Sequence, residues 1–185
     1  MLKDLTQRAE RDMRKGIEAT VREFNGVRTG RASPALLDGI LVDAYGSPTP
    51  LPKVATVSTA STNLLTVQPW DPSLLSPIEK AILKSDLGIT PATDGRVIRL
   101  AIPSLTEDRR KELVKVVRRM AEEGRVAIRN IRRDANEGIK KFEKEKKISE
   151  DDGRRGADQI QELTNRLIKE IDALLAKKEK EIMEF

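Results

Sequence analysis

Residues 106–147 decide the fold of this chain; they read TEDRRKELVKVVRRMAEEGRVAIRNIRRDANEGIKKFEKEKK. Apolar side chains recur in this stretch every three or four residues, which is the spacing of one face of an α-helix. They are Leu113, Val117, Met120, Ile128, Ile131, Ala135 and Phe142. Thr106 is a favourable N-cap, and the acids that follow it suit the positive end of a helix dipole. We therefore expect one helix of roughly 60 Å, at 1.5 Å per residue.

Two further helices are predicted on either side of this one. The first has its apolar positions at Leu2, Leu5, Ala9, Met13, Ile17, Val21 and Phe24. The last begins after Ser149, an N-cap followed by three acids, and its apolar positions are Ile160, Leu163, Leu167, Ile171, Leu174 and Ile182. Each helix can bury only a narrow stripe by itself. Three stripes that face one another predict a three-helix bundle.

The segment between the first two helices is of a different kind. All nine prolines of the chain lie between Pro34 and Pro103, and proline is excluded from helix interiors. Residues 31–105 carry 6 basic and 6 acidic side chains, whereas the flanks carry 29 and 24. Strands are predicted at 41–45, 54–57, 64–67 and 97–102, with a turn at Gly46-Ser47-Pro48 and a short helix capped by Ser76.

These patterns predict an α+β fold made of two domains. Residues 1–30 and 105–185 form an elongated three-helix bundle, and residues 31–104 form a small β/α/β domain inserted into it. No apolar stretch is long enough for a membrane span, and the N-terminus lacks the apolar run of a signal peptide. The absence of cysteine fits a reducing cytosol. We expect a cytoplasmic protein that does not contact membranes.

The composition also limits the chemistry. With neither cysteine nor histidine, the chain lacks the usual zinc ligands, thiol nucleophiles and imidazole bases. It contains no phosphate-binding glycine loop. An enzyme that uses only carboxylates, or serine and lysine, is still compatible with this composition. The adjacent acids Asp151 and Asp152 would point about 100° apart on a helix, so they do not form one site. We predict a binding protein with no catalytic residues, metal or cofactor.

A basic stripe on the long helix is the candidate binding surface. Between Arg109 and Arg133 there are 10 basic and 3 acidic residues. Seven of the basic residues lie within about 60° of one line along the helix, and the apolar stripe is centred roughly 130° away. They are Lys111, Lys115, Arg118, Arg125, Arg129, Arg132 and Arg133. Most charge runs are simply solvated, but acids that could pair with these arginines are sparse in the stretch. We therefore predict an anionic partner.

The kind of anion follows from what the chain lacks. Proteins that read single strands stack bases on aromatic side chains, and only 3% of this chain is aromatic. Recognition of a structured RNA through its backbone and shape fits better. The low aromatic content does not exclude DNA as the partner.

Four motifs carry a family resemblance. They are RTGRASP at 28–34, SDLG at 85–88, LTEDRR at 105–110 and EGRVAIRNIRR at 123–133. Together they resemble the bacterial ribosome recycling factor family, and the resemblance runs the full length of the chain. One departure is Asn165, where many relatives carry an acid.

The resemblance implies both a fold and a function. It implies an L-shaped monomer near the dimensions of a transfer RNA, with a bundle and a β/α/β domain joined by two linkers. It implies that the bundle binds ribosomal RNA of the large subunit after termination. Elongation factor G and GTP would then drive separation of the subunits and release from messenger RNA. The alternative is a helical structural or chaperone-like module that binds structured nucleic acid non-specifically through the basic face.

The resemblance also assigns residues. The family's RNA-contacting arginines correspond to Arg28, Arg129, Arg132 and Arg133, and Arg125 lies on the same helix face. The two linkers would provide a hinge between the domains. The hinge residues are Gly30, Arg31, Pro103, Ser104 and Leu105.

Overall fold

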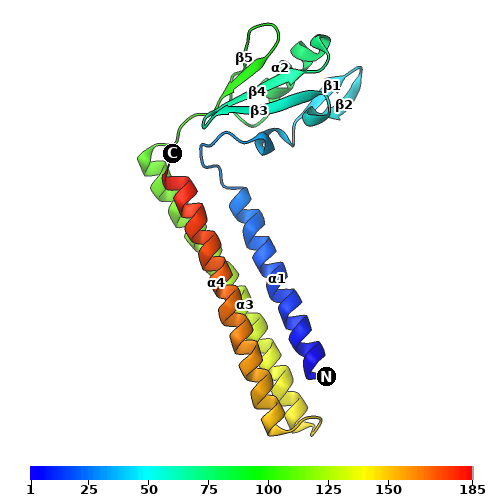
Figure 1. Cartoon of the computed structure of the whole chain (residues 1–185), viewed down its shortest axis with the longest axis vertical. Coiled ribbons are helices and arrows are strands. Elements are labelled where there is room, and N and C mark those ends of the chain that lie inside the picture. Colours follow the sequence, from blue (N-terminus) through cyan, green and yellow to red (C-terminus); the bar gives the residue numbers. More distant parts are fainter. Residues whose placement is uncertain (185) are drawn as a thin grey trace. The chain divides into compact units, whose positions relative to one another are not determined.

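The structure is a computed structural model that describes residues 1–184. Long helices form one compact unit, which comprises Met1–Arg28 and Glu107–Glu184. Short strands and one short helix form the other, Thr29–Thr106 (Figure 1). We call them the bundle and the module. The predicted α+β class is thereby confirmed: the chain contains a bundle of three long helices and a small antiparallel sheet domain.

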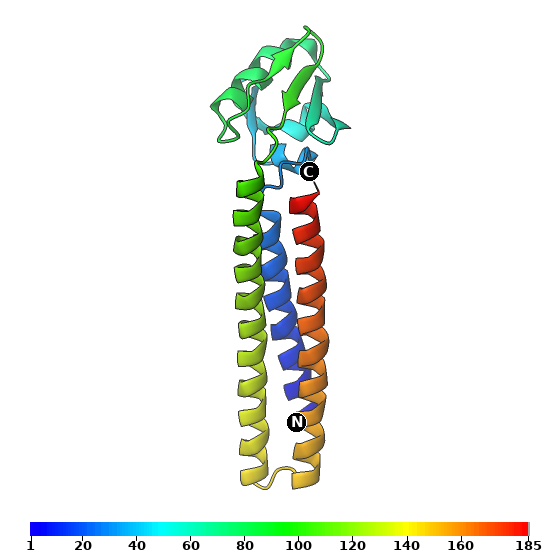
Figure 2. The ribbon, with the colours of Figure 1, turned by 90° about the vertical axis from the view of Figure 1, so that its left-hand side faces the viewer.

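The bundle contains α1 (Leu2–Asn25), α3 (Glu107–Lys144) and α4 (Glu150–Met183). Helices α3 and α4 form an antiparallel hairpin, and α1 packs along both, with its N-terminus toward the turn of that hairpin (Figure 2). The predicted apolar stripes supply most of the core. The fully buried side chains include Met13, Val117, Ile128, Ile160, Leu167 and Ile171.

The stripe of α3 differs in detail from the prediction. Met120, Ile131 and Phe142 are only half-buried. Small or neighbouring residues take places in the core instead, namely Ala121, Gly124 and Ile139. The bundle helices therefore approach one another more closely than the large side chains of the predicted stripe would allow.

The turn between α3 and α4 is short and well capped. Helix α3 ends at Lys144, slightly before the predicted end near residue 147. Lys146 then adopts a left-handed conformation with φ of 55°. The predicted cap of α4 is confirmed, since Oγ of Ser149 accepts a hydrogen bond of 3.1 Å from the backbone N–H of Asp152.

The module contains two antiparallel sheets. Strands β1 (Leu41–Ala44) and β2 (Ser47–Pro50) form a hairpin. The second sheet has the order β3-β4-β6-β5. Its strands are β3 (Ala55–Ser61), β4 (Leu64–Pro69), β5 (Ala92–Thr93) and β6 (Ile98–Ala101).

The hairpin corrects one prediction. The turn lies at Tyr45 and Gly46, whose φ angles are 54° and 82°, and positive angles at both positions are typical of a two-residue hairpin turn. Ser47–Pro50 is therefore a strand and not part of the turn. Proline lacks an N–H but is tolerated in an edge strand such as this one.

A short helix and three 3₁₀ turns complete the module. The turns are η1 (Pro34–Leu37), η2 (Leu51–Lys53) and η3 (Pro72–Leu74), and η3 leads directly into α2 (Leu75–Lys84). The predicted cap at Ser76 is wrong, because that residue already lies inside α2. The side chain of Asp71 caps this segment instead, by accepting a 2.9 Å hydrogen bond from the N–H of Ser73.

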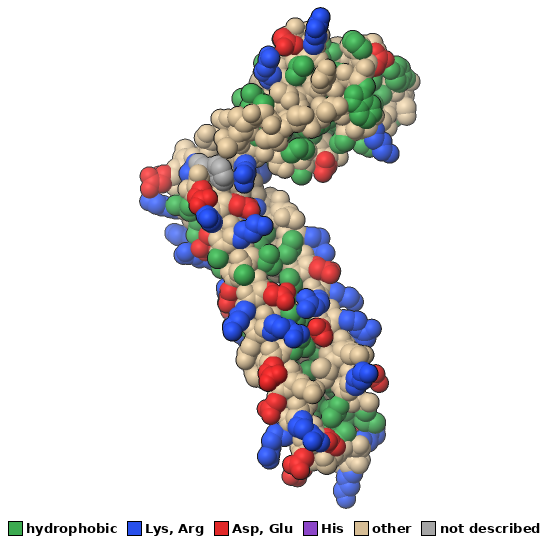
Figure 3. Space-filling view, in the orientation of Figure 1, with side chains coloured by type: hydrophobic (Ala, Val, Ile, Leu, Met, Phe, Trp, Pro, Cys, Tyr) green, Lys and Arg blue, Asp and Glu red, His purple; other side chains and the backbone are tan. Residues whose placement is uncertain are grey.

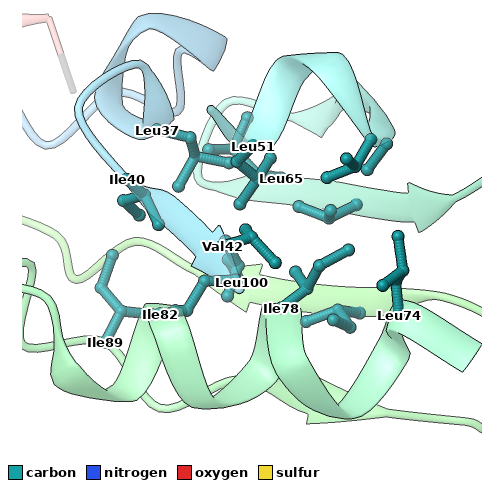
Figure 4. Close-up of a cluster of buried hydrophobic side chains, with 14 of the residues drawn as sticks. Leu37, Ile40, Val42, Leu51, Leu65, Leu74, Ile78, Ile82, Ile89 and Leu100 are labelled. Atoms are coloured by element: carbon teal, nitrogen blue, oxygen red, sulfur yellow. The ribbon is translucent and has the colours of Figure 1, made fainter. Parts of the chain in front are cut away.

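The core of the module lies between α2 and the strands. Ile78 and Ile82 of α2 point toward Leu65, Leu100 and Val42 (Figure 4). All five side chains are essentially inaccessible to solvent. The module thus has a hydrophobic core of its own, as an independent domain requires.

Candidate RNA-binding interface

The basic stripe of α3 borders α4. Arg118, Arg125 and Arg132 recur every seven residues, which is close to two helical turns, so they share one face. Their partners on the antiparallel helix run in the opposite direction along the chain: Glu179, Asp172 and Gln161. Basic and acidic side chains alternate along the face of the bundle shown in Figure 3. These three residues of the predicted stripe therefore form a ladder of contacts between α3 and α4.

Arg118 and Arg125 are held by carboxylates of α4. Nε of Arg118 lies 2.6 Å from Oε1 of Glu179, and this hydrogen bond raises the pKa of the guanidinium. Nη2 of Arg125 lies 2.7 Å from Oδ1 of Asp172. Burial alone would lower the pKa of Arg125, but hydrogen bonds to Asp172 and Glu122 together raise it. The Arg125 side chain is only 18% exposed, so it is tied into the bundle.

Glu122 links two arginines of the stripe. Its two carboxylate oxygens lie 3.0 Å from Nη1 of Arg125 and 3.1 Å from Nη1 of Arg129. Hydrogen bonds from Arg125 and then Arg129 lower the pKa of Glu122. Much of the charge of these two arginines is therefore balanced within the protein.

Arg132 differs from the other arginines of the ladder. Its Nη1 donates a 3.1 Å hydrogen bond to Oε1 of Gln161, which carries no charge. Gln161 in turn donates from Nε2 to Oδ1 of Asn165 at 2.9 Å. Nε of Arg132 is buried and has no hydrogen-bond partner in the described part of the chain. The positive charge of Arg132 is thus oriented but not neutralised.

Of the predicted RNA-binding residues, Arg133 and Arg28 are the most accessible to a ligand from solvent. Both side chains are exposed, and neither forms an ion pair with any residue within 1–184. Arg28 lies three residues beyond the end of α1. Gly26 and Val27, just before it, line a hollow together with Arg119, Met120 and Glu123 of α3. Arg28 therefore belongs to the same end of the bundle as the first half of α3.

The prediction that few acids can pair with these arginines is wrong. Few acids lie within residues 109–133, but α4 supplies Asp172 and Glu179 from the facing helix. The Glu122 contacts span three and seven residues along α3, a spacing that the sequence does show. The partners on α4 depend on the register of two antiparallel helices, and no local pattern in the sequence gives it.

The predicted hinge residues lie close together in the module. Gly30 has φ of 74°, a conformation that other residues rarely adopt. A Cβ atom at this position would lie 3.2 Å from Cγ of Leu105 and 3.5 Å from the carbonyl oxygen of Pro103. Glycine is therefore required here both by its backbone angle and by the close passage of the second linker.

Other kinds of site are not found in the described chain. Within residues 1–184, no group of three or more acids is placed to hold a metal ion. No helix of the described chain is long and apolar enough to cross a membrane.

Comparison with known proteins gives consistent matches. A family model described as ribosome recycling factor matches residues 20–183. The ribosome-recycling factor of Syntrophomonas wolfei is 57% identical over 184 residues, which is 100% of both chains. That of Legionella pneumophila (strain Corby) is 55% identical over 184 residues, again 100% of both.

Two solved structures are similar along the whole chain. A solution structure of the ribosome recycling factor has a TM-score of 0.77 and 43% identity, and the match covers 100% of this chain and 98% of that one. A second structure describes the T. thermophilus ribosome recycling factor and E. coli elongation factor G bound to the E. coli post-termination complex. It has a TM-score of 0.65 and 47% identity, and the match covers 99% of both chains.

These matches confirm the resemblance inferred from the motifs at 28–34 and 123–133, and with it the prediction of a translation factor that is not an enzyme. A family model spanning most of the chain, and relatives more than half identical over its whole length, show that the chain belongs to the ribosome recycling factor family.

Proposed function

We propose that this protein binds the post-termination ribosome and, with elongation factor G and GTP, promotes its dissociation into subunits and its release from messenger RNA. The observation that carries this proposal is the 47% identical structure in which a recycling factor and elongation factor G are bound to a post-termination complex. The protein acts as a monomer in the cytoplasm, where such ribosomes are found.

The bundle is the ribosome-binding part in this proposal. Its basic face lies on ribosomal RNA of the large subunit, with Arg28, Arg125, Arg129, Arg132 and Arg133 as the contact residues. Arginine offers forked donors that match phosphate geometry. The ion pairs divide the five residues into two groups. Arg28, Arg132 and Arg133 supply charge that no carboxylate within residues 1–184 balances, whereas Arg125 and Arg129 share Glu122 and shape the surface around them.

In this proposal the linkers of the module act as a hinge during subunit splitting. The proposed hinge consists of Gly30-Arg31 and Pro103-Ser104-Leu105, which lie near the two ends of the module, Thr29–Thr106. Two adjacent linkers permit bending about an axis but restrain free rotation. In this proposal the bundle holds the RNA while elongation factor G displaces the module, so that the hinge serves splitting rather than binding.

Substitution of the unbalanced arginines tests the binding surface. A variant with Arg132→Ala and Arg133→Ala is compared with a control carrying Arg11→Ala and Arg154→Ala, which removes two exposed arginines elsewhere on the bundle. We expect weaker binding to isolated large subunits only in the first variant. Thermal unfolding of both should change by only about 0.5 kcal/mol, as for most surface substitutions. Equal binding by both variants would reject this surface.

The same assay separates the alternative function. A non-specific nucleic-acid module would bind bulk RNA as tightly as large subunits. We expect a clear preference for large subunits, and splitting of post-termination ribosomes only when elongation factor G and GTP are present.

A further inference from the structure

The basic face contains one arginine whose partner is chemically unlike the others. From Arg118 to Arg129, each arginine of the stripe that contacts a neighbouring side chain contacts a carboxylate. Arg132 instead contacts the amide oxygen of Gln161. An amide accepts a hydrogen bond as a carboxylate does, but it leaves the positive charge uncompensated.

The orientation of the Gln161 amide follows from donor and acceptor chemistry. A guanidinium has only donors, so Gln161 must turn its oxygen toward Arg132. Its NH₂ group then faces Asn165, whose side-chain oxygen accepts at 2.9 Å. Asn165 thus fixes the rotation of the Gln161 amide. An acid at position 165 would accept the same bond.

The remaining donors of Arg132 define how it can meet a ligand. Nη1 gives one hydrogen to Gln161, and Nε is buried without a partner. Because Nε is buried, a ligand that approaches from solvent cannot reach it. Within residues 1–184 only Gln161 accepts from this guanidinium, so Nη2 and the second hydrogen of Nη1 are left for an external acceptor. A phosphate that approaches the end of the guanidinium can accept both.

Resting on the proposed function, we propose that Gln161, fixed by Asn165, is a positioning residue for Arg132. It holds the guanidinium at the border of α3 and α4 with its full charge directed to a phosphate of ribosomal RNA. A free arginine would lose side-chain entropy when it bound phosphate, and preorganisation lowers that cost. A carboxylate at 161 would orient the side chain equally well but would compete with the phosphate for its charge.

Two substitutions of Gln161 separate orientation from charge. Gln161→Glu keeps an acceptor for Arg132 and neutralises it, so affinity for isolated large subunits should fall about three- to tenfold, the range of an ordinary hydrogen bond. The dependence of binding on salt should also become shallower, by about one phosphate contact. Gln161→Met removes the acceptor and keeps the charge. Its affinity should fall about threefold, from lost preorganisation, with the salt dependence unchanged.

The matched control is Gln159→Glu. Gln159 is exposed on α4, two residues away and therefore on the other side of the helix. The control adds the same charge without contacting Arg132, and its affinity should stay close to that of the parent protein. An effect of Gln159→Glu equal to that of Gln161→Glu would overturn the proposal, because net charge alone would then explain it.

A double-mutant cycle tests the positioning role of Gln161 separately from the proposed RNA-binding function of Arg132. In an Arg132→Met background, Gln161→Met should have no further effect on binding, because its target is gone. If Arg132→Met itself leaves binding unchanged, the proposed RNA surface fails. If Arg132→Met weakens binding but both Gln161 variants bind normally, only the positioning role fails. Loss of thermal stability in Gln161→Met in proportion to its loss of binding would also overturn that role.

Discussion

Glu122 sets how much positive charge the α3 surface presents. Its carboxylate accepts hydrogen bonds from Arg125 and Arg129 at 3.0 and 3.1 Å, and both bonds lower its pKa. At neutral pH it is therefore ionised and balances part of their charge. The sequence suggests a row of unpaired arginines on this surface. In the structure, Glu122 partly cancels the charge of that row.

Removal of this carboxylate should strengthen RNA binding. Glu122→Gln is expected to raise affinity for large subunits by about two- to fivefold, comparable to the energy of an exposed ion pair, and to steepen the salt dependence. Glu123→Gln is the control, since Glu123 is exposed and forms no ion pair within residues 1–184. Equal gains in the two variants would show that only net charge matters.

The same substitution has a predictable pH dependence. Because the folded-state pKa of Glu122 lies below its ordinary value, its contribution to stability is present above the unfolded pKa and is lost as pH falls through the folded one. The stability difference between the parent and Glu122→Gln, followed by denaturant unfolding, should thus be largest near neutral pH and shrink in acid.

At the level of helices, Gly124 determines how closely α1 approaches the α3–α4 hairpin. A Cβ atom at this position would lie 2.5 Å from Oγ1 of Thr20 on α1 and 3.2 Å from Cδ1 of Ile171 on α4. Thr20 is itself buried, and its hydroxyl donates to the carbonyl oxygen of Gly16. All three helices therefore meet at a residue that has no side chain.

Two glycine substitutions should have opposite effects on stability. Gly124→Ala is expected to destabilise the protein by about 1–2 kcal/mol, because overpacking exceeds the gain in helix propensity. Gly16→Ala on α1 should stabilise it by up to about 1 kcal/mol, since no atom lies within 4 Å of the added methyl group. Thermal or denaturant unfolding measures both.

A second substitution tests whether contact with Thr20 causes the expected loss of stability in Gly124→Ala. Thr20→Ala removes the nearest atom, so it should recover part of the stability lost in Gly124→Ala. A Gly124→Ala variant as stable as Gly16→Ala would show that the helices can move apart to fit the methyl group without loss of stability.

The elements that the sequence predicts well are those with a local signal. The helix periodicity gave all three bundle helices, and Ser149 marked the start of α4 correctly. Strand β2 was missed because its two prolines indicate a turn. The core role of Gly124 and the partners of the arginines depend on how helices meet in space. Neither leaves a pattern in the chain that composition or spacing can detect.

At the scale of the whole molecule, the two linkers are the proposed moving part. Gly30 and Leu105 lie against each other where the linkers pass. No backbone hydrogen bond involving the amide of Ser104 is found in the described chain. A proline at 104 would therefore restrict the backbone without removing a donor that the fold uses.

Stiffening this linker should affect splitting more than binding. Ser104→Pro is expected to bind large subunits with unchanged affinity and to split post-termination ribosomes several-fold more slowly. Ser104→Ala, which shortens the side chain but leaves the backbone free, should behave as the parent protein. Normal splitting by a Ser104→Pro variant shown to be stiffer, for example by relaxation measurements on the linker amides, would remove the hinge from the mechanism.

The insertion of the module between α1 and α3 has a consequence for biosynthesis. Helix α1 ends at residue 25 and α4 at residue 183, so at about 5–20 residues per second α1 is made about 8–30 s before its last partner. The module's own contacts lie within Thr29–Thr106, so it can fold while α3 is still being synthesised. During that interval the nascent α1 carries an unburied apolar stripe that chaperones can recognise. The bundle that carries the proposed RNA-binding surface is thus completed only when α4, its last helix, has left the ribosome that makes it.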